Sequence, residues 1–264
     1  MGKIAVIGGT GVCDTRMLTD IREDRLDTFY GPIQYIKGTY KGKEIIFLPR
    51  HGKNHSIPPH LINYRANILG LKRLGVTAIF TTTAVGSLNL KFKPNEFVLP
   101  HQFIDFTKTR HTSFFDGGEN GVVHADMTEP YCRHLQRAVL KAATLLGDYT
   151  IHHGGTYVCT EGPRFETPAE IAMFAKWGGD LVGMTNVPEV CLAREAEMCY
   201  TTVSMVTNFA AGISAEMLTH AEVLTCMEEN SERIRRLLMK AVEIYEDGDC
   251  RCRHALDYYG GFMV

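Results

Sequence analysis

Short apolar runs alternate with helix-like segments along almost the whole chain, and this alternation restricts the possible folds more than any other feature. The expected strands are Ile4 to Ile7, Ile45 to Leu48, Val76 to Phe80, Gly155 to Cys159, Asp180 to Met184 and Cys199 to Val206. The expected helices are Leu61 to Leu74, Arg133 to Leu146, Thr167 to Trp177, Glu189 to Met198 and Ala221 to Tyr245. Strands that alternate with helices predict a largely parallel sheet with helices on both faces. Because no linker, repeat or low-complexity stretch interrupts the pattern, we expect residues 1–264 to form a single α/β domain, with a central mixed, mostly parallel sheet flanked by helices.

The charge and the apolar pattern of the chain give no sign of a nucleic-acid or membrane partner. A formal net charge of −2 gives no reason to expect nucleic acid or an acidic membrane surface as a partner. The apolar runs are short and broken by Gly, Thr or charged residues, so no membrane-spanning helix is expected. The chain moves from Met1 directly into a strand-like run without the apolar core of a signal peptide, and the default setting is the cytoplasm.

Neither the cysteines nor the histidines are expected to form a metal site. The eight cysteines contain no CxxC pair and no Cys/His ligand pattern, so a structural zinc site is not expected. Cys250 and Cys252 are one residue apart, and they either form a tight disulfide or remain thiols. His51, His55 and His60 have ligand-like spacing, but a Pro-Pro pair breaks the helix that would bring two of them to one face. We therefore expect no metal ion.

Polar residues gather just after the expected strands, which is where small-molecule sites form in such sheets. These segments are Gly8 to Gly11, Arg50-His51, Thr81 to Ser87, Glu161 to Thr167, Gly183 to Thr185 and Thr207-Asn208. Arg50, His51 and the recurring threonines suit an oxyanion, because each contributes a hydrogen-bond donor and none a compensating negative charge. The glycine-rich turn matches neither a full dinucleotide fingerprint nor a phosphate loop with its Lys, and it also fits a simple strand-exit turn. No Ser/His/Asp or Cys/His arrangement stands out, so covalent catalysis is not expected.

Five of these motifs, in this order, resemble the trimeric purine nucleoside phosphorylases and methylthioadenosine phosphorylases. They are Gly8-Gly9-Thr10-Gly11, Arg50-His51-Gly52, Thr82 to Ser87, Glu161 to Phe165 and Gly183 to Glu189. The resemblance implies cleavage of a purine nucleoside by inorganic phosphate, a co-substrate, to free base and sugar 1-phosphate without a cofactor. It implies a phosphate site made of Thr10, Arg50, His51, Thr83, Ala84 and Thr185. It implies a nucleoside site made of Phe165, Glu166, Met184, Asn208, Ala210, His220 and, from a neighbouring subunit, His124.

Two residues point to one branch of this family. Methylthioadenosine enzymes resemble the chain up to Phe165 but have a small hydroxyl residue next and an Asp in place of Asn208. Glu166 can accept a hydrogen bond from N1–H, which only 6-oxopurines carry, and Asn208 can donate to O6 or N7 as negative charge builds on the departing base. The pair resembles the inosine and guanosine type and predicts that adenosine is rejected.

The sugar end and the assembly follow from the resemblance alone. His220 falls where 6-oxopurine enzymes place a His against the ribose 5′-hydroxyl, whereas methylthio-specific relatives have an apolar residue there. A shift of one position in the alignment leaves S-methyl-5′-thioinosine, or methylthioadenosine, as the alternative substrate. The resemblance also implies a homotrimer or a dimer of trimers, and Cys250-Arg251-Cys252 resembles a CxC element of some heat-stable relatives.

The expected mechanism needs no covalent intermediate. Phosphate held by Arg50, His51 and the threonines lies beneath the anomeric carbon, and the C–N bond stretches first to give an oxocarbenium-like ribose. Asn208 and Glu166 then stabilise the leaving base, so catalysis is positioning plus preorganised electrostatics. Two rival functions are a hydrolase that uses water, which has little use for Arg50 and the threonines, and a non-catalytic anion-binding module, which leaves Glu166 and Asn208 without a role.

Overall fold

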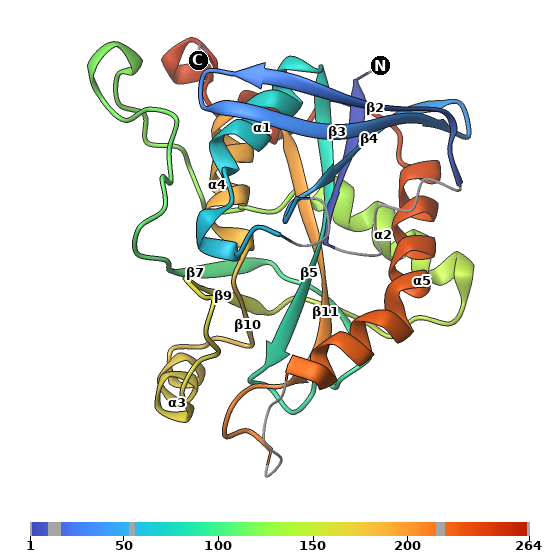
Figure 1. Ribbon diagram of the computed structural model, residues 1–264, viewed down its shortest axis with the longest axis vertical. Helices are drawn as coiled ribbons and strands as arrows, with labels where there is room; N and C mark the ends of the chain where they lie inside the picture. The colour runs from blue at the N-terminus through green and yellow to red at the C-terminus, as the bar shows by residue number, and fades with distance from the viewer. Residues whose placement is uncertain (1, 10–16, 53–55, 215–219, 263–264) are drawn as a thin grey trace.

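The longest strand, β5 (Val76–Ser87), runs through the centre of the sheet in the computed structural model, which describes residues 2–9, 17–52, 56–214 and 220–262 (Figure 1). It pairs in parallel with β1 and β11 and antiparallel with β10. The remaining strand order is β2-β3-β4-β1 on one side and β10-β9-β7 on the other, with β6 and β8 joined through β11. The other strands are β1 (Lys3–Gly8), β2 (Thr19–Thr28), β3 (Gly31–Tyr40), β4 (Lys43–Pro49), β6 (Phe97–Leu99), β7 (Gln102–Phe106), β8 (Ile151–His153), β9 (Thr156–Thr160), β10 (Leu181–Gly183) and β11 (Cys199–Phe209). The predicted mixed, mostly parallel sheet is confirmed.

Helices cover both faces of this sheet, and each face has its own apolar core. The helices are α1 (Tyr64–Arg73), α2 (Arg133–Leu146), α3 (Pro168–Lys176), α4 (Asn186–Glu195) and α5 (His220–Ile244). Helices α1 and α4 lie together on one face, and α2 and α5 pack against each other on the opposite face (Figure 1). Ile68 and Val190 belong to the first core, and Val139 and Leu238 to the second. None of the helices in the described part of the chain is both long and apolar enough to cross a membrane.

Helix α3 begins with a reciprocal side-chain cap. The Thr167 side chain accepts a hydrogen bond from the backbone N–H of Glu170, whose carboxylate in turn accepts from the backbone N–H of Thr167. This reciprocal pair satisfies two backbone donors at the start of the helix, where no carbonyl is available to accept from them. The cap fixes where α3 begins and therefore how the loop that precedes it is held.

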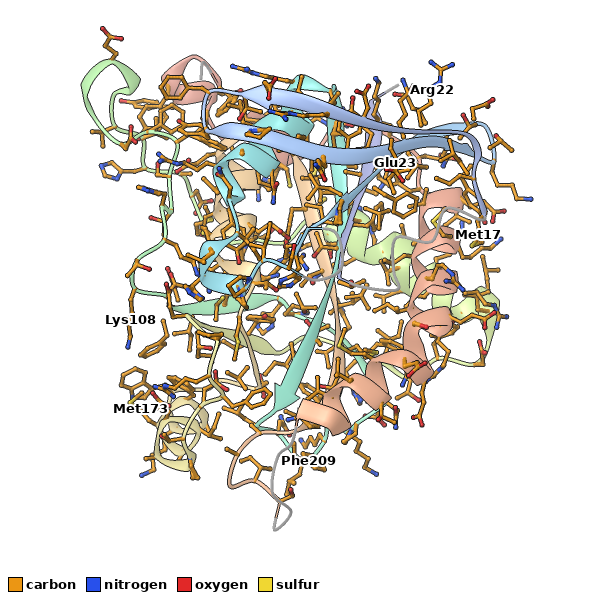
Figure 2. The ribbon with its side chains drawn as sticks, viewed as in Figure 1. Met17, Arg22, Glu23, Lys108, Met173 and Phe209 are labelled. Atoms are coloured by element: carbon orange, nitrogen blue, oxygen red, sulfur yellow. The ribbon has the colours of Figure 1, made fainter. Side chains whose placement is uncertain are left out.

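The sequence pattern missed the β2–β3 hairpin and three short strands. Almost every side chain of β2 is exposed, and Arg22 and Glu23 lie on this outer ribbon (Figure 2). A strand with no buried face has no alternation of apolar and polar residues, which is the signal that identifies strands in a sequence. Strands β6, β7 and β8 are three to five residues long, too short for a period to be read.

Candidate functional site

A cavity of about 490 Å³ opens at the carboxyl ends of the central strands. Small-molecule sites usually have volumes of about 300–1,000 Å³, so a nucleoside with phosphate is within its range. The carboxyl ends of β5 and β11 meet at Ser87 and Phe209, at the lower end of both strands in the view of Figure 2. Most of the predicted site residues line the cavity: Arg50, His51, Thr83, Ala84, Phe165, Glu166, Met184, Thr185, Asn208 and Ala210.

Three predicted site residues are not among those lining residues. Thr10 lies outside the described residues, although its neighbour Gly9 lines the cavity. His220 is the first residue of α5, and its side chain is also outside the description. His124 lies exposed in an irregular loop, where its backbone N–H donates to the Tyr259 hydroxyl at 3.3 Å. Within its own chain, His124 therefore takes no part in the cavity.

Arg50, which directly follows β4, is buried and held by an acidic partner that the sequence analysis missed. Its Nε and Nη2 donate to the two carboxylate oxygens of Glu189 at 2.8 and 2.7 Å, and its Nη1 donates to the carbonyl of Thr82 at 2.8 Å. Burial alone lowers the pKa of Arg50, but the charge of Glu189 outweighs it and raises the pKa above its ordinary value. The set of donors named from the sequence therefore left out a buried carboxylate that accompanies them.

This pairing changes what Arg50 offers to an anion. The fork formed by Nε and Nη2 faces Glu189, so only the remaining N–H groups on Nη1 and Nη2 are available for another acceptor. Glu189 is itself fully buried and also accepts from the Tyr200 hydroxyl at 2.8 Å. The site therefore presents fixed hydrogen-bond donors with little net positive charge at this end, an arrangement that binds an oxyanion by directed hydrogen bonds.

His51 has a defined ring orientation. Its Nδ1 lies 2.9 Å from the carbonyl oxygen of Ile57. A carbonyl only accepts, so Nδ1 carries the hydrogen, and the neutral ring then has an acceptor at Nε2. Donation from Nε2 to an oxyanion therefore requires the protonated imidazolium, which the sequence analysis did not foresee.

The Thr83 hydroxyl lies at the cavity and is bonded to a hydroxyl of the neighbouring central strand. Thr83 of β5 lies opposite Ser204 of β11, and their hydroxyl oxygens are 3.0 Å apart. Since a hydroxyl both accepts and donates, Ser204 can fix the Thr83 hydroxyl as a donor toward the cavity. Thr185 follows β10 and is also buried at the cavity wall.

Glu166 is held in place by Thr160, the last residue of β9. The Thr160 hydroxyl donates to Oε1 of Glu166 at 2.6 Å. Burial raises the pKa of Glu166 above its ordinary value, and the hydrogen bond from Thr160 only partly opposes this. A half-buried carboxylate with one oxygen already fixed has its other oxygen available to accept from a ligand.

A bulge in β11 sets the direction of Asn208. Val206 pairs with Val85 and Asn208 with Gly86, so Thr207 is the extra residue between them. The Thr207 hydroxyl donates to Oδ1 of Asn208 at 2.7 Å, and Nδ2 of Asn208 donates to the Phe209 carbonyl at 2.8 Å. Because the amide nitrogen carries two hydrogens, one remains for a ligand. Bulges near active sites often redirect a side chain in this way.

Two glycines make room for the site. A Cβ at Gly86 would lie 3.2 Å from Nδ2 of Asn208, and a Cβ at Gly162 would lie 2.6 Å from Sδ of Met184. Gly162 also has φ of +66°, a conformation that L-residues with side chains rarely adopt. The loop from Gly162 thereby brings Phe165, which is 39% exposed, to the rim of the cavity. An aromatic face at the rim suits a flat heterocyclic base.

Helix α5 closes the cavity with a mostly apolar surface. Val223, Met227 and Ile234 line it, with Ser231 as the polar exception. A wall with both apolar and polar patches accepts a ligand that is partly sugar and partly base.

The sequence analysis gave no role to three residues that hold other site side chains in place. Glu189 bonds Arg50 from a distant part of the chain, Thr160 bonds Glu166 across the loop after β9, and Thr207 bonds Asn208 at a bulge. One signal was present, since Glu189 ends the Gly183 to Glu189 motif. Chemically, the cavity combines an oxyanion end rich in donors with a carboxylate and an amide beside an aromatic ring.

Comparisons with known proteins agree with this arrangement. Residues 3–243 match the model of the phosphorylase superfamily. A probable 6-oxopurine nucleoside phosphorylase of Thermococcus kodakarensis is 54% identical over 97% of this chain and 98% of its own. A probable S-methyl-5′-thioinosine phosphorylase of Methanothermobacter thermautotrophicus is 46% identical over 96% of this chain and 88% of its own. The structure of methylthioadenosine phosphorylase from Schistosoma mansoni with adenine is similar at a TM-score of 0.91 and 31% identity, over 98% of this chain and 97% of that one. The chain therefore belongs to the phosphorylase superfamily.

Proposed function

We propose that the protein is a purine nucleoside phosphorylase that cleaves 6-oxopurine nucleosides such as inosine and guanosine, with inorganic phosphate, to free base and ribose 1-phosphate. The observation that carries the proposal is the pairing of Glu166 and Asn208 in one cavity with the donors around Arg50. Relatives 50–54% identical to this chain are named as 6-oxopurine nucleoside phosphorylases, some of them as probable ones.

The proposed mechanism assigns one end of the cavity to each product. Phosphate accepts hydrogen bonds from Arg50, Thr83, Thr185 and the imidazolium of His51, and its negative charge stabilises the cationic ribose as the C–N bond stretches. The purine lies against Phe165, and its N1–H donates to Glu166. The second N–H of Asn208 donates to O6 or N7, where negative charge grows as the base departs. No side chain forms a covalent bond to the substrate.

Methylthio nucleosides are the second candidate substrates. Val223, Met227 and Ile234 present apolar surface to the cavity, which would accept a thioether at the 5′ position. The 46% identical relative named as a probable methylthioinosine phosphorylase supports the same alternative. A preference for nucleosides with a 5′-hydroxyl over those with a 5′-methylthio group depends on His220.

A substrate panel tests the proposal and separates these candidates. Inosine, guanosine, adenosine and S-methyl-5′-thioinosine are each incubated with the protein, with and without phosphate, and base release is followed. We expect phosphate-dependent cleavage of inosine and guanosine and none of adenosine. Better cleavage of S-methyl-5′-thioinosine than of inosine would assign the enzyme to the salvage of methylthio nucleosides. Release without phosphate indicates a hydrolase, and binding without turnover indicates a binding module.

Glu166→Gln should weaken activity on inosine and change its pH dependence. We expect kcat/KM to fall by roughly 10- to 150-fold, since a hydrogen bond to a charged group contributes about 1.5–3 kcal/mol. In the wild type, kcat/KM should fall as acid protonates Glu166, at a pH above the ordinary carboxyl pKa of about 4.3, because burial raises this pKa. The raised pKa also means that Glu166 favours folding below its unfolded pKa and loses this contribution as pH rises through the folded pKa.

The measurement is the pH profile of kcat/KM for both proteins. The acid limb should disappear in Glu166→Gln and persist in Glu129→Gln, which changes a glutamate paired with Arg133. An unchanged acid limb in Glu166→Gln would assign the titration to another group.

The assembly and compartment are part of the same proposal. A homotrimer, alone or as a dimer of trimers, would allow His124 of one subunit to reach a neighbour's cavity, which its own chain does not permit. Light scattering after size-exclusion chromatography measures the mass of the assembly, and a monomer would remove this role from His124. A salvage enzyme works where its nucleosides and phosphate are, so the cytoplasm is the proposed compartment.

A further inference from the structure

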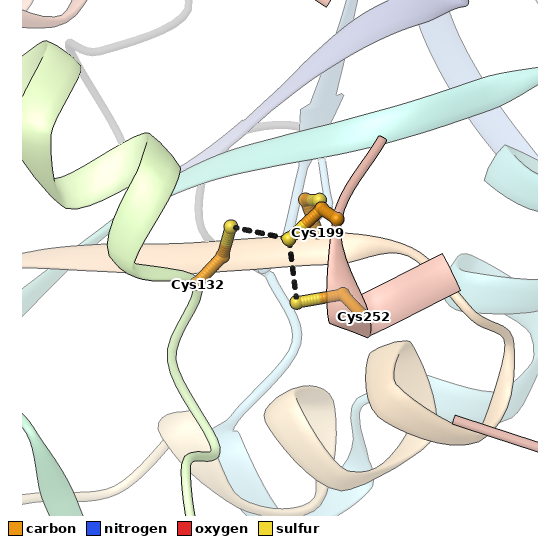
Figure 3. Close-up of side chains that lie close together, drawn as sticks. Cys132, Cys199 and Cys252 are labelled. Atoms are coloured by element: carbon orange, nitrogen blue, oxygen red, sulfur yellow. Dashed lines mark hydrogen bonds between the residues drawn. The ribbon is translucent and has the colours of Figure 1, made fainter. Parts of the chain in front are cut away.

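Four cysteines from three distant segments meet at the end of β11 opposite the cavity. Cys132 caps the start of α2, Cys199 is the first residue of β11, and Cys250 and Cys252 belong to the C-terminal segment. Their four sulfur atoms all lie within 4.8 Å of one another. Figure 3 shows Cys199 between Cys132 and Cys252, with interactions to both.

Two of the sulfur–sulfur distances in this cluster are close to those of a tetrahedral metal site. Sγ of Cys250 lies 3.6 Å from Sγ of Cys132 and 3.6 Å from Sγ of Cys252. With Zn–S bonds of about 2.3 Å, the sulfurs of a tetrahedral site are about 3.8 Å apart. A disulfide requires about 2.05 Å. The observed distances fit four ligands around one ion better than two bonded pairs.

The surroundings suit the negative charge of such a site. The cluster is closed, since Cys132, Cys199 and Cys252 are all buried and Cys250 is only partly exposed. The first turn of α2 has unpaired backbone N–H groups next to Cys132, and a helix start favours a thiolate. Arg194 acts electrostatically on Cys252, and Arg253 on Cys199.

We propose that Cys132, Cys199, Cys250 and Cys252 bind one structural Zn²⁺ ion. Four protein ligands leave no open position for water or substrate, so the ion has no catalytic role. It connects the C-terminal segment to α2 and β11. The N–H groups of Leu256 and Phe262, which donate to the carboxylate of Glu197, and the buried side chain of Leu256 also hold that segment.

The sequence analysis expected no zinc site because it looked for ligands close together in sequence. Only one pair here is local, and the other two cysteines arrive through the fold. A tight disulfide between Cys250 and Cys252, which the sequence analysis left open beside free thiols, is the main alternative; both are free thiols in this structure. The proposal does not depend on the substrate, since the cluster and the cavity lie at opposite ends of β11.

Metal analysis of the whole protein tests the proposal. The protein is made in zinc-containing medium, purified anaerobically without chelator or reductant, and measured by elemental mass spectrometry. We expect one zinc per chain, released stoichiometrically by a mercurial that titrates the cluster thiols. Replacement by Co²⁺ should give the visible absorption of a tetrahedral tetrathiolate.

Variants locate the site. Cys252→Ser should lose the zinc and lower Tm, and Cys250→Ser, at the partly exposed position, should bind zinc at least tenfold more weakly. Cys191→Ser, outside the cluster, should keep one zinc per chain. Zinc-free wild-type protein in which all eight cysteines titrate after unfolding would overturn the proposal in favour of free thiols. Zinc-free protein with four cysteines untitrated would overturn it in favour of two disulfides.

Discussion

Asn208→Ala is expected to lower kcat for inosine by about 100- to 1,000-fold, because removal of one preorganised donor to a developing negative charge raises the barrier by about 2.7–4 kcal/mol. The bulge at Thr207 and the hydrogen bonds to Oδ1 and from Nδ2 hold the amide in one orientation before substrate binds. The donor therefore needs no reorganisation when charge builds on the base. Because the interaction strengthens in the transition state, kcat should fall more than KM rises.

Asn208→Asp is the matched variant for this prediction. It keeps the size of the side chain but replaces the donor with an acceptor, so activity on inosine should fall while adenosine, with its 6-amino donor, gains relative to inosine. Steady-state kinetics on both nucleosides measure the effect, and Tm shows that both variants are folded. A loss of less than about tenfold in Asn208→Ala would contradict the assigned role, since it corresponds to only about 1.4 kcal/mol.

Glu189→Ala is expected to lower the free energy of unfolding by about 3–5 kcal/mol, because it leaves the buried charge of Arg50 without its partner. The pair is almost fully removed from solvent, with exposed side-chain fractions of 2% and 0%. The Tyr200 hydroxyl would lose its acceptor on Glu189 as well. Chemical denaturation of both proteins measures the difference.

An exposed pair supplies the control for Glu189→Ala. Arg25 and Asp27 lie 2.8 Å apart with side chains 61% and 76% exposed, so Asp27→Ala should cost about 1 kcal/mol or less. The double variant Arg50→Met with Glu189→Leu should recover much of the lost stability but not phosphate-dependent activity. If Glu189→Ala lowered the free energy of unfolding no more than Asp27→Ala does, Glu189 would not be the partner that stabilises the buried charge of Arg50.

The elements that the sequence predicts differ from those it misses in whether they have a buried face. Strands such as β1 and helices such as α2 have a buried face, so their periodicity is visible in the sequence alone. β2 has almost none, and its hairpin with β3 exists because the chain pairs with itself. Backbone pairing leaves no trace in side-chain pattern when neither face is covered.

The site shows the same division. The sequence by itself determined which residue types follow the strands, because Arg50, Thr83, Glu166 and Asn208 are brought to one edge by any parallel sheet with these strands. Only the tertiary structure decided the charge partners and the orientation of these side chains. It neutralises Arg50 with Glu189, orients Glu166 through Thr160, turns Asn208 through a bulge and gathers the four cysteines. The Arg50–Glu189 pair, the bulge of β11 against β5 and the cysteine cluster depend on contacts between segments far apart in the chain, and local sequence carries no record of such contacts.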